Sequence, residues 1–191
     1  MSCFPRFQVQ LGRGSPTERF DCGPRTVQMG IDALTCGQLR PTIPEIRKRM
    51  GAPGAQPTTV YHAERCVESY DHIPHRHPLV YRILRTTAEV KEAVGNEHPV
   101  QVAISYRDYN RTGNTGDPNF MGGHSILVLG QRKAMGHEIQ WHVLDPLNDG
   151  RRTGIPHGPR WIDRGRVVSA MEAFSPGTVF AGVFTGGAKR G

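Results

Sequence analysis

The chain has 191 residues and a formal net charge of +7, and 20 of its 24 basic residues are arginines. This length suits one folded domain with a sizeable core, and 37% hydrophobic residues with 23 glycines indicate a globular, loop-rich protein and exclude a disordered one. No apolar run approaches the roughly 18 residues of a transmembrane helix, and no secretory signal is visible, so we expect synthesis in the cytoplasm and no membrane span. No basic run is interleaved with aromatic residues, so nucleic-acid binding is not favoured.

The first part of the chain is expected to be helical after a short edge strand and a loop in residues 1–20. Val27, Ile31 and Leu34 recur at helical spacing, which predicts a helix that begins at Cys22 and ends before Gly37. Two further helices are predicted, at Ile43 to Met50 and at Thr58 to Ser69.

The later part of the chain changes to alternating apolar patterns, which predict strands. Strands are expected at 79–84, 99–106, 122–130, 138–144 and 178–184, with short helices at 87–94 and 166–174 and polar loops at 107–122 and 149–160. Helices first and an antiparallel sheet later is the α+β pattern. Since no repeat or linker interrupts the chain, we expect a single domain, 1–191, with a helical half at 21–78 and a sheet half at 79–191.

The strand at 122–130 opens with His124, and the strand at 138–144 is followed at once by Asp145. If the two strands form a hairpin centred between Ala134 and Met135 without a bulge, His124 and Asp145 face each other at its open end. Facing residues of an antiparallel pair have Cβ atoms about 4.5–5.5 Å apart. The register therefore predicts an imidazole beside a carboxylate.

Cys22 is predicted to lie at the first position of its helix, with Asp21 as the N-cap. Backbone N–H groups and the positive end of the helix dipole favour an anion there, and a thiolate is one. A buried, inert cysteine is the alternative interpretation, and the carboxylate of Asp21 would oppose a thiolate next to it. A cysteine nucleophile also needs a base, and the base needs a group that fixes its tautomer.

Three segments in this order carry a resemblance to a known family: Asp21-Cys22-Gly23-Pro24, Gly123-His124-Ser125 and Val143-Leu144-Asp145-Pro146. Together they resemble the papain-like cysteine peptidases, and most closely the branch that trims double-glycine leaders from bacteriocins, with its stand-alone bacterial and phage relatives. The resemblance spans about residues 20 to 146. It implies a papain-like fold, no cofactor, and a triad of Cys22 as nucleophile, His124 as general base and Asp145 as the orienting carboxylate.

The family also uses a glutamine, typically six residues before the cysteine, to stabilise the oxyanion. Here that position is Pro16, so the resemblance leaves Gln10 or Gln8 as the candidate oxyanion donor, if the intervening loop is an insertion. Loss of one oxyanion donor lowers the rate by roughly 10²–10³ in a comparable site. The departure therefore bears on turnover and not on the fold.

The substrate is expected to be a peptide. No ATPase domain or P-loop is present, so leader trimming coupled to export is not supported. A small basic peptidase without a signal peptide fits a phage-type endopeptidase that cleaves cell-wall peptide crosslinks, carried in a virion or tail with other virion proteins, or released by lysis. Two alternatives remain: a non-catalytic structural or binding module with the same fold, and an acyltransferase of transglutaminase type.

Other residues receive less weight. The four cysteines show no metal spacing and do not form an evident disulfide framework, and Cys36 and Cys66 are expected in the core. Trp141 is also expected in the core, with a place in the cleft wall as the alternative. A histidine-rich stretch could bind zinc, but no closed set of four ligands is visible, so no metal site is expected. It comprises Asp71, His72, His75 and His77. A basic segment is expected to be a solvated loop, with a contact to an anionic substrate as the alternative. Its residues are Arg151, Arg152, Arg160, Arg164 and Arg166.

Overall fold

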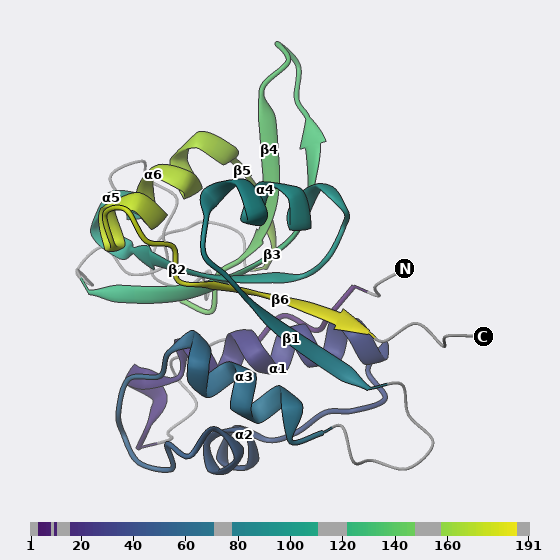
Figure 1. Ribbon diagram of the computed structural model, residues 1–191, viewed down its shortest axis with the longest axis vertical. Coiled ribbons are helices and arrows are strands. Elements are labelled where there is room, and N and C mark those ends of the chain that lie inside the picture. Colours follow the sequence, from purple (N-terminus) through teal and green to yellow (C-terminus); the bar gives the residue numbers. More distant parts are fainter. Residues whose placement is uncertain are drawn as a thin grey trace.

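A computed structural model of the chain describes residues 4–8, 10, 16–70, 78–110, 122–147 and 158–186. Its helices lie on both faces of a six-stranded antiparallel sheet (Figure 1). The helices are η1 (Glu18–Phe20), α1 (Cys22–Thr35), α2 (Ile43–Met50), α3 (Val60–Glu68), α4 (Thr87–Gly95), α5 (Tyr106–Asn110) and α6 (Arg164–Phe174). The strands are β1 (Leu79–Leu84), β2 (Val100–Ser105), β3 (Gly123–Lys133), β4 (Ile139–Leu144), β5 (Arg160–Asp163) and β6 (Ala181–Gly186). This mixture of helices with an antiparallel sheet confirms the expected α+β class.

The strands are ordered β1-β6-β2-β3-β4-β5, so the last strand of the chain is inserted between the first two. β2 and β3 pair over their whole shared length, from Val100 opposite Val128 to Ser105 opposite Gly123. In this register His124 faces Ile104. The pairing of β2 with β3 therefore fixes the position of His124 near the start of β3.

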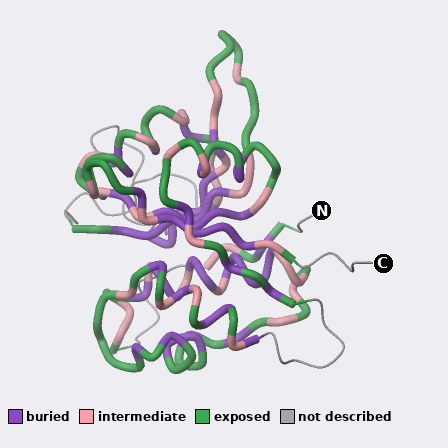
Figure 2. The backbone as a smooth tube through the Cα atoms, in the orientation of Figure 1, coloured by how far each residue is buried: buried purple, intermediate pink, exposed green. Residues whose placement is uncertain are grey.

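The sheet is covered on both faces, and Figure 2 shows its central strands mostly buried. On one face α1, α2 and α3 pack through residues such as Val27, Ile46 and Val67 against Leu127 and Phe184 of the sheet. On the other face α4, α5 and α6 pack over a second cluster, which contains the fully buried Trp141 as expected.

Helix boundaries follow local sequence signals. α2 begins with a capping box in which Thr42 and Glu45 each bond the other's backbone N–H, and it ends at Gly51, whose φ of 73° is left-handed. α1 ends at Cys36 and Gly37, with φ values of 50° and 76°. These signals are why α2 begins, and α1 and α2 end, where the sequence predicts.

Several details of the sequence-based prediction are wrong. The edge strand expected within 1–20 is not formed by residues 4–8 or 10, where Arg6 instead donates its backbone N–H to Asp32 of α1; residues 9 and 11–15 lie outside the described residues. Cys66 is buried as expected, but Cys36 is exposed at the end of α1 and is disulfide-bonded. β5 has no counterpart in the prediction, in which the loop at 149–160 covers only its first residue, because four residues are too short for an alternating pattern to stand out.

The predicted register of the β3–β4 hairpin is also wrong. Lys133 pairs with Ile139, and Leu127 pairs with Leu144, with a bulge between Val128 and Gln131. The turn is longer than assumed, since the N–H of Ala134 donates to the carbonyl of Glu138. Continued past Leu144, the observed pairing sets Asp145 opposite Ile126, two residues from the predicted partner.

Candidate active site

Cys22 is the first residue of α1, as predicted, and is half-buried. The hydroxyl of Thr26 lies 2.7 Å from the Cys22 carbonyl oxygen and 3.2 Å from that of Ser125, so it ties the first turn of α1 to β3. Pro24 fits here because N–H groups in the first turn of a helix have no acceptor within the helix, so a residue without an N–H loses no hydrogen bond. This contact between α1 and β3 sets Cys22 beside His124.

His124 and Asp145 meet even though the predicted register is wrong. The Nε2 atom of His124 lies 2.7 Å from Oδ1 of Asp145, and both side chains are almost completely buried. The slip is by two residues, and an even slip keeps a side chain on the same face of the sheet. Asp145 is therefore a diagonal neighbour of His124, within reach of a long side chain. The N–H of Leu147 donates to the same carboxylate oxygen at 2.9 Å and holds it in place.

The pKa of Cys22 is lowered. Burial alone would raise it, but this is outweighed by a hydrogen bond from His124, by the charge of that ring, and by the backbone N–H groups of Ser125 and Gly23. Because Nε2 of His124 is directed to Asp145, Nδ1 is the ring nitrogen that faces the thiol. The lowered pKa favours the nucleophilic thiolate.

The pKa of His124 moves in the opposite direction. Burial disfavours the charged ring, but the charge and hydrogen bond of Asp145, together with the contact to Cys22, raise the pKa to about 9. The ring of Tyr106 packs edge-on against the imidazole, with centroids 4.8 Å apart and planes at 74°. Both shifts therefore favour a thiolate next to an imidazolium over the neutral pair.

A cleft of about 500 Å³ opens beside these residues and is lined mainly by apolar side chains. Three parts of the chain form its walls: η1 and the start of α1, the segment 57–60 that leads into α3, and β2 and β3 with the aromatic rings of Phe174 and Phe180. Cys22 and His124 both line it. The nucleophile candidate is therefore reachable from solvent.

The structure does not bring the candidate oxyanion glutamine into this cleft. Gln10 is buried, and its backbone N–H donates to the carbonyl of Pro146, next to Asp145; it is not among the described residues that line the cleft. Gln8 is half-buried and Pro16 is exposed. A role for either glutamine stays a prediction.

The remaining sequence candidates lie elsewhere. The histidine-rich stretch falls within 71–77, and Arg151 and Arg152 fall within 148–157, all outside the described residues. In the described parts of the chain, no cluster of three His, Cys, Asp or Glu side chains could hold a metal ion. The helices within those parts are too short or too polar to cross a membrane.

Comparison with known proteins was made on both sequence and structure. No family model matches the chain, and no curated protein matches it. Among solved structures, a crystal structure of a candidate C39-like peptidase from Bacillus anthracis superposes with a TM-score of 0.60 at 10% sequence identity, covering 99% of this chain and 100% of that one. The chain therefore shares the overall fold of that protein.

Two contributors to the site were not predicted from the sequence. Tyr106 follows β2 directly, and its ring restrains His124 from the neighbouring strand. Arg47 of α2 bonds the residue before the nucleophile. Arg47 is the one charged residue among the buried positions of α2, and that signal could have marked it as a buried ion-pair partner.

Proposed function

We propose that this protein is a thiol-dependent peptidase or amidase with a Cys22-His124-Asp145 triad on a papain-like fold. The observation that carries the proposal is the contiguous row of Cys22, His124 and Asp145 at an open cleft, with the pKa of the thiol lowered and that of the imidazole raised. The shared fold with the candidate C39-like peptidase supports it.

In the proposed reaction the Cys22 thiolate attacks the amide carbonyl carbon and forms a tetrahedral intermediate. The imidazolium of His124 gives its proton to the leaving nitrogen, the C–N bond breaks, and a thioester remains on Cys22. Neutral His124 then takes a proton from water, whose oxygen attacks the thioester carbon. The C–S bond breaks, the acid is released, and the Cys22 thiolate remains beside protonated His124. Asp145 keeps the ring oriented and stabilises its charged form.

The developing oxyanion needs donors. Cys22 is the first residue of α1, so its N–H has no acceptor within the helix and can supply one donor. Gln10 is the proposed second donor, with Gln8 as the alternative, and the Gln10 side chain would have to leave its buried position beside Pro146 to act.

The cleft favours a peptide with a bulky apolar side chain near the scissile bond, because Phe20, Phe174 and Phe180 supply most of its aromatic surface. Cell-wall peptide crosslinks cleaved by a phage-type enzyme, in a virion or after lysis, remain the proposed biological substrate. Zymography on purified wall material with the wild type and Cys22→Ala tests this; clearing by the wild type alone supports it, and no clearing by either variant contradicts it.

Replacement of Cys22 tests the activity itself. Cys22→Ser and Cys22→Ala should abolish hydrolysis of a fluorogenic peptide library and labelling by a thiol-directed electrophile, whereas Cys66→Ser should change neither. Cys66 is a fitting control because burial raises its pKa to about 12. Undiminished hydrolysis in the Cys22 variants would end the proposal.

The two alternatives make different predictions. A non-catalytic module would be favoured by a thiol remote from the imidazole or by a plugged cleft; the open cleft lined by both Cys22 and His124 supports the peptidase instead. An acyltransferase would use the same three residues, so products formed with an added amine nucleophile distinguish transfer from hydrolysis.

A further inference from the structure

Arg47 is a buried charge whose role the proposed reaction does not use. Its side chain is 2% exposed, and its Nε donates to Oδ1 of Asp21 at 2.7 Å. Asp21 is the N-cap residue of α1, as predicted, but it is fully buried and its side chain makes no capping bond. The carboxylate is held by Arg47 and by the hydroxyl of Thr17.

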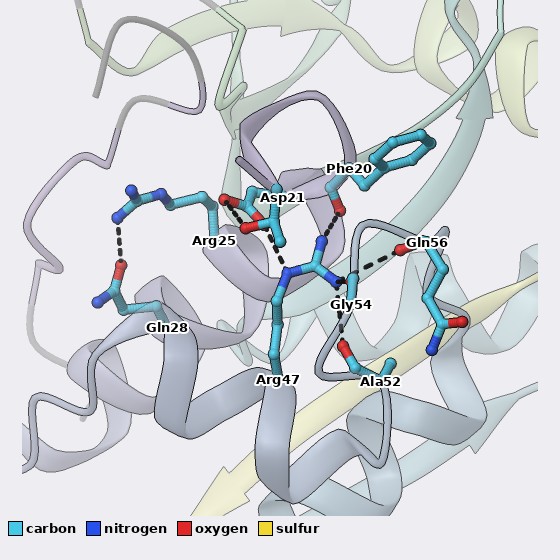
Figure 3. Close-up of polar contacts among 9 residues, drawn as sticks. Phe20, Asp21, Arg25, Gln28, Arg47, Ala52, Gly54 and Gln56 are labelled. Atoms are coloured by element: carbon cyan, nitrogen blue, oxygen red, sulfur yellow. Dashed lines mark hydrogen bonds and ion pairs between the residues drawn. The ribbon is translucent and has the colours of Figure 1, made fainter. Parts of the chain in front are cut away.

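The rest of the guanidinium bonds backbone carbonyls before Cys22 and in the loop that follows α2 (Figure 3). One nitrogen donates to the carbonyl of Phe20, two residues before the nucleophile, at 2.7 Å. The other donates to the carbonyls of Ala52, Gly54 and Gln56, in the loop that leads to the cleft wall at 57–60.

The cleft wall at 57–60 and the first turn of α1, which carries Cys22, are also in direct contact. A Cβ on Gly23 would overlap the side chain of Thr58, so the first turn of α1 is packed tightly against this wall. A displacement of the loop at 52–56 would therefore reach Cys22.

The charge of Asp21 has a second consequence. A carboxylate beside Cys22 disfavours a thiolate, and a guanidinium paired with that carboxylate cancels the effect. An unpaired buried carboxylate is also strongly unfavourable, which accounts for a buried arginine at this point.

We propose that Arg47 is a positioning residue for Cys22. It cancels the charge of Asp21, and it joins the start of α1, where Cys22 lies, to the loop that leads to the cleft wall at 57–60. The inference rests on the proposed function, in which Cys22 is the nucleophile. His124 acts on the thiol from the sheet side, and Arg47 acts from the helical side.

The elements packed around Cys22 carry several charged or titratable side chains. They are Glu18 and Arg19 on η1, Asp21, Arg25 on α1, Arg47 on α2, His62 on α3, and His124 on β3 with Asp145 behind it. Of these, Asp21 and Arg47 form a second buried pair, separate from His124 and Asp145, and they can be removed one at a time or together.

The test is the pH dependence of Cys22 alkylation by iodoacetamide, followed by peptide mapping so that only Cys22 is counted. Asp21→Asn removes the carboxylate and leaves the cation, so the midpoint should move down by about 1 pH unit, the size of shift that a nearby charge imposes. Arg47→Met leaves the carboxylate, so the midpoint should move up by about the same amount. The double variant should return close to the wild type.

Arg40→Met is the matched control, because Arg40 pairs with Asp32 at the other end of α1 at 3.3 Å; it should not move the midpoint. Should Arg47→Met fail to fold by circular dichroism, Asp21→Asn still decides, since it keeps the carbonyl bonds of Arg47. Shifts of both single variants in the same direction, or no shift in Asp21→Asn, would overturn the inference.

Alkylation needs no turnover, so the outcome is separate from that of the proposed function. Shifts of opposite sign in a protein that cleaves no substrate would support the role of Arg47 and contradict the peptidase. Hydrolysis by a protein whose alkylation midpoints do not move in the variants would support the peptidase and contradict the role of Arg47.

Discussion

At the scale of single residues, the candidate site contains two neighbouring groups, Cys22 and His124, whose pKa values shift in opposite directions. The lowered pKa of Cys22 and the pKa of about 9 for His124 belong to a coupled pair, so the pair titrates in two steps. In the proposed reaction, the thiol is protonated below the first step and cannot attack. Above the second step the ring has lost the proton that the leaving amine of the proposed reaction needs.

The first prediction is therefore a bell-shaped pH profile. The value of kcat/KM should rise as Cys22 deprotonates, at a pH below the ordinary value for a thiol, and should fall with a midpoint near 9 as His124 loses its proton. The measurement is kcat/KM on a fluorogenic peptide across the pH range. A falling limb near the ordinary histidine value would contradict the assignment.

The second prediction concerns Asp145. Burial opposes the charged ring of His124, and the charge of Asp145 is the largest influence in its favour, so Asp145→Asn should move the falling limb to lower pH. Asparagine keeps an oxygen for the Nε2 proton, so this variant should retain more activity than Asp145→Ala. Asp163→Asn, which removes the capping carboxylate of α6, should leave the limb in place. An unmoved limb in Asp145→Asn would count against the role of Asp145.

At the scale of elements, α1 must sit close to the sheet to hold Cys22 against β3. The closest approach is at Gly30, where an added Cβ would lie 2.5 Å from the ring of Phe184 on β6. A glycine inside a helix normally weakens it by about 0.5–1 kcal/mol relative to alanine. Here close packing is the reason for the glycine.

The third prediction uses this contact. Gly30→Ala should lower the free energy of unfolding by about 1–3 kcal/mol, because the helix must move away from the sheet. Gly95→Ala, in α4, meets only the end of a glutamine side chain at 3.4 Å and should be neutral or stabilising. Urea denaturation of both variants measures the difference. A stabilised Gly30→Ala would show that α1 is not tightly packed at this point.

Local signals let the sequence predict most elements but not their pairing. α2 and β1 have the predicted bounds, since a capping box with an αL glycine marks α2 and a regular alternation marks β1. The β3–β4 register failed because a bulge and the turn at 134–138 leave no clear mark in the sequence. The contact between His124 and Asp145 was still predicted, because the register was wrong by two residues and both side chains stayed on the same face of the sheet.

The parts of the site that were missed all depend on long-range packing. Tyr106 reaches His124 across paired strands, and Arg47 reaches Asp21 from another helix. Neither contact has a fixed spacing in sequence. The side-chain capping bond expected of Asp21 is absent for the same reason, because its carboxylate binds Arg47, which is distant in sequence.

At the scale of the whole molecule, the cleft lies where the helical layer of α1–α3 meets the end of the sheet. The last residue of α6, Phe174, and the residue before β6, Phe180, supply two aromatic rings. Phe174 is 40% exposed, so its ring contributes to the cleft more than to the core. It also covers Gly123, where a Cβ would lie 2.5 Å from the ring.

The fourth prediction follows from that exposure. Phe174→Ala should raise KM for peptides with a bulky apolar side chain by about tenfold, the effect of losing one apolar contact, with little change in melting temperature. Met135→Ala, at the fully exposed hairpin turn, should change neither value. An unchanged KM in Phe174→Ala would mean that the substrate does not reach this part of the cleft.

The central claim is that Cys22, His124 and Asp145 act as one unit, and the alkylation of Cys22 in His124→Ala tests it most directly. In the wild type the thiol should react with iodoacetamide at a pH below its ordinary pKa. In His124→Ala the hydrogen bond and the charge that offset burial are gone, so the midpoint should rise to the ordinary value or above it. An unchanged midpoint would contradict the account.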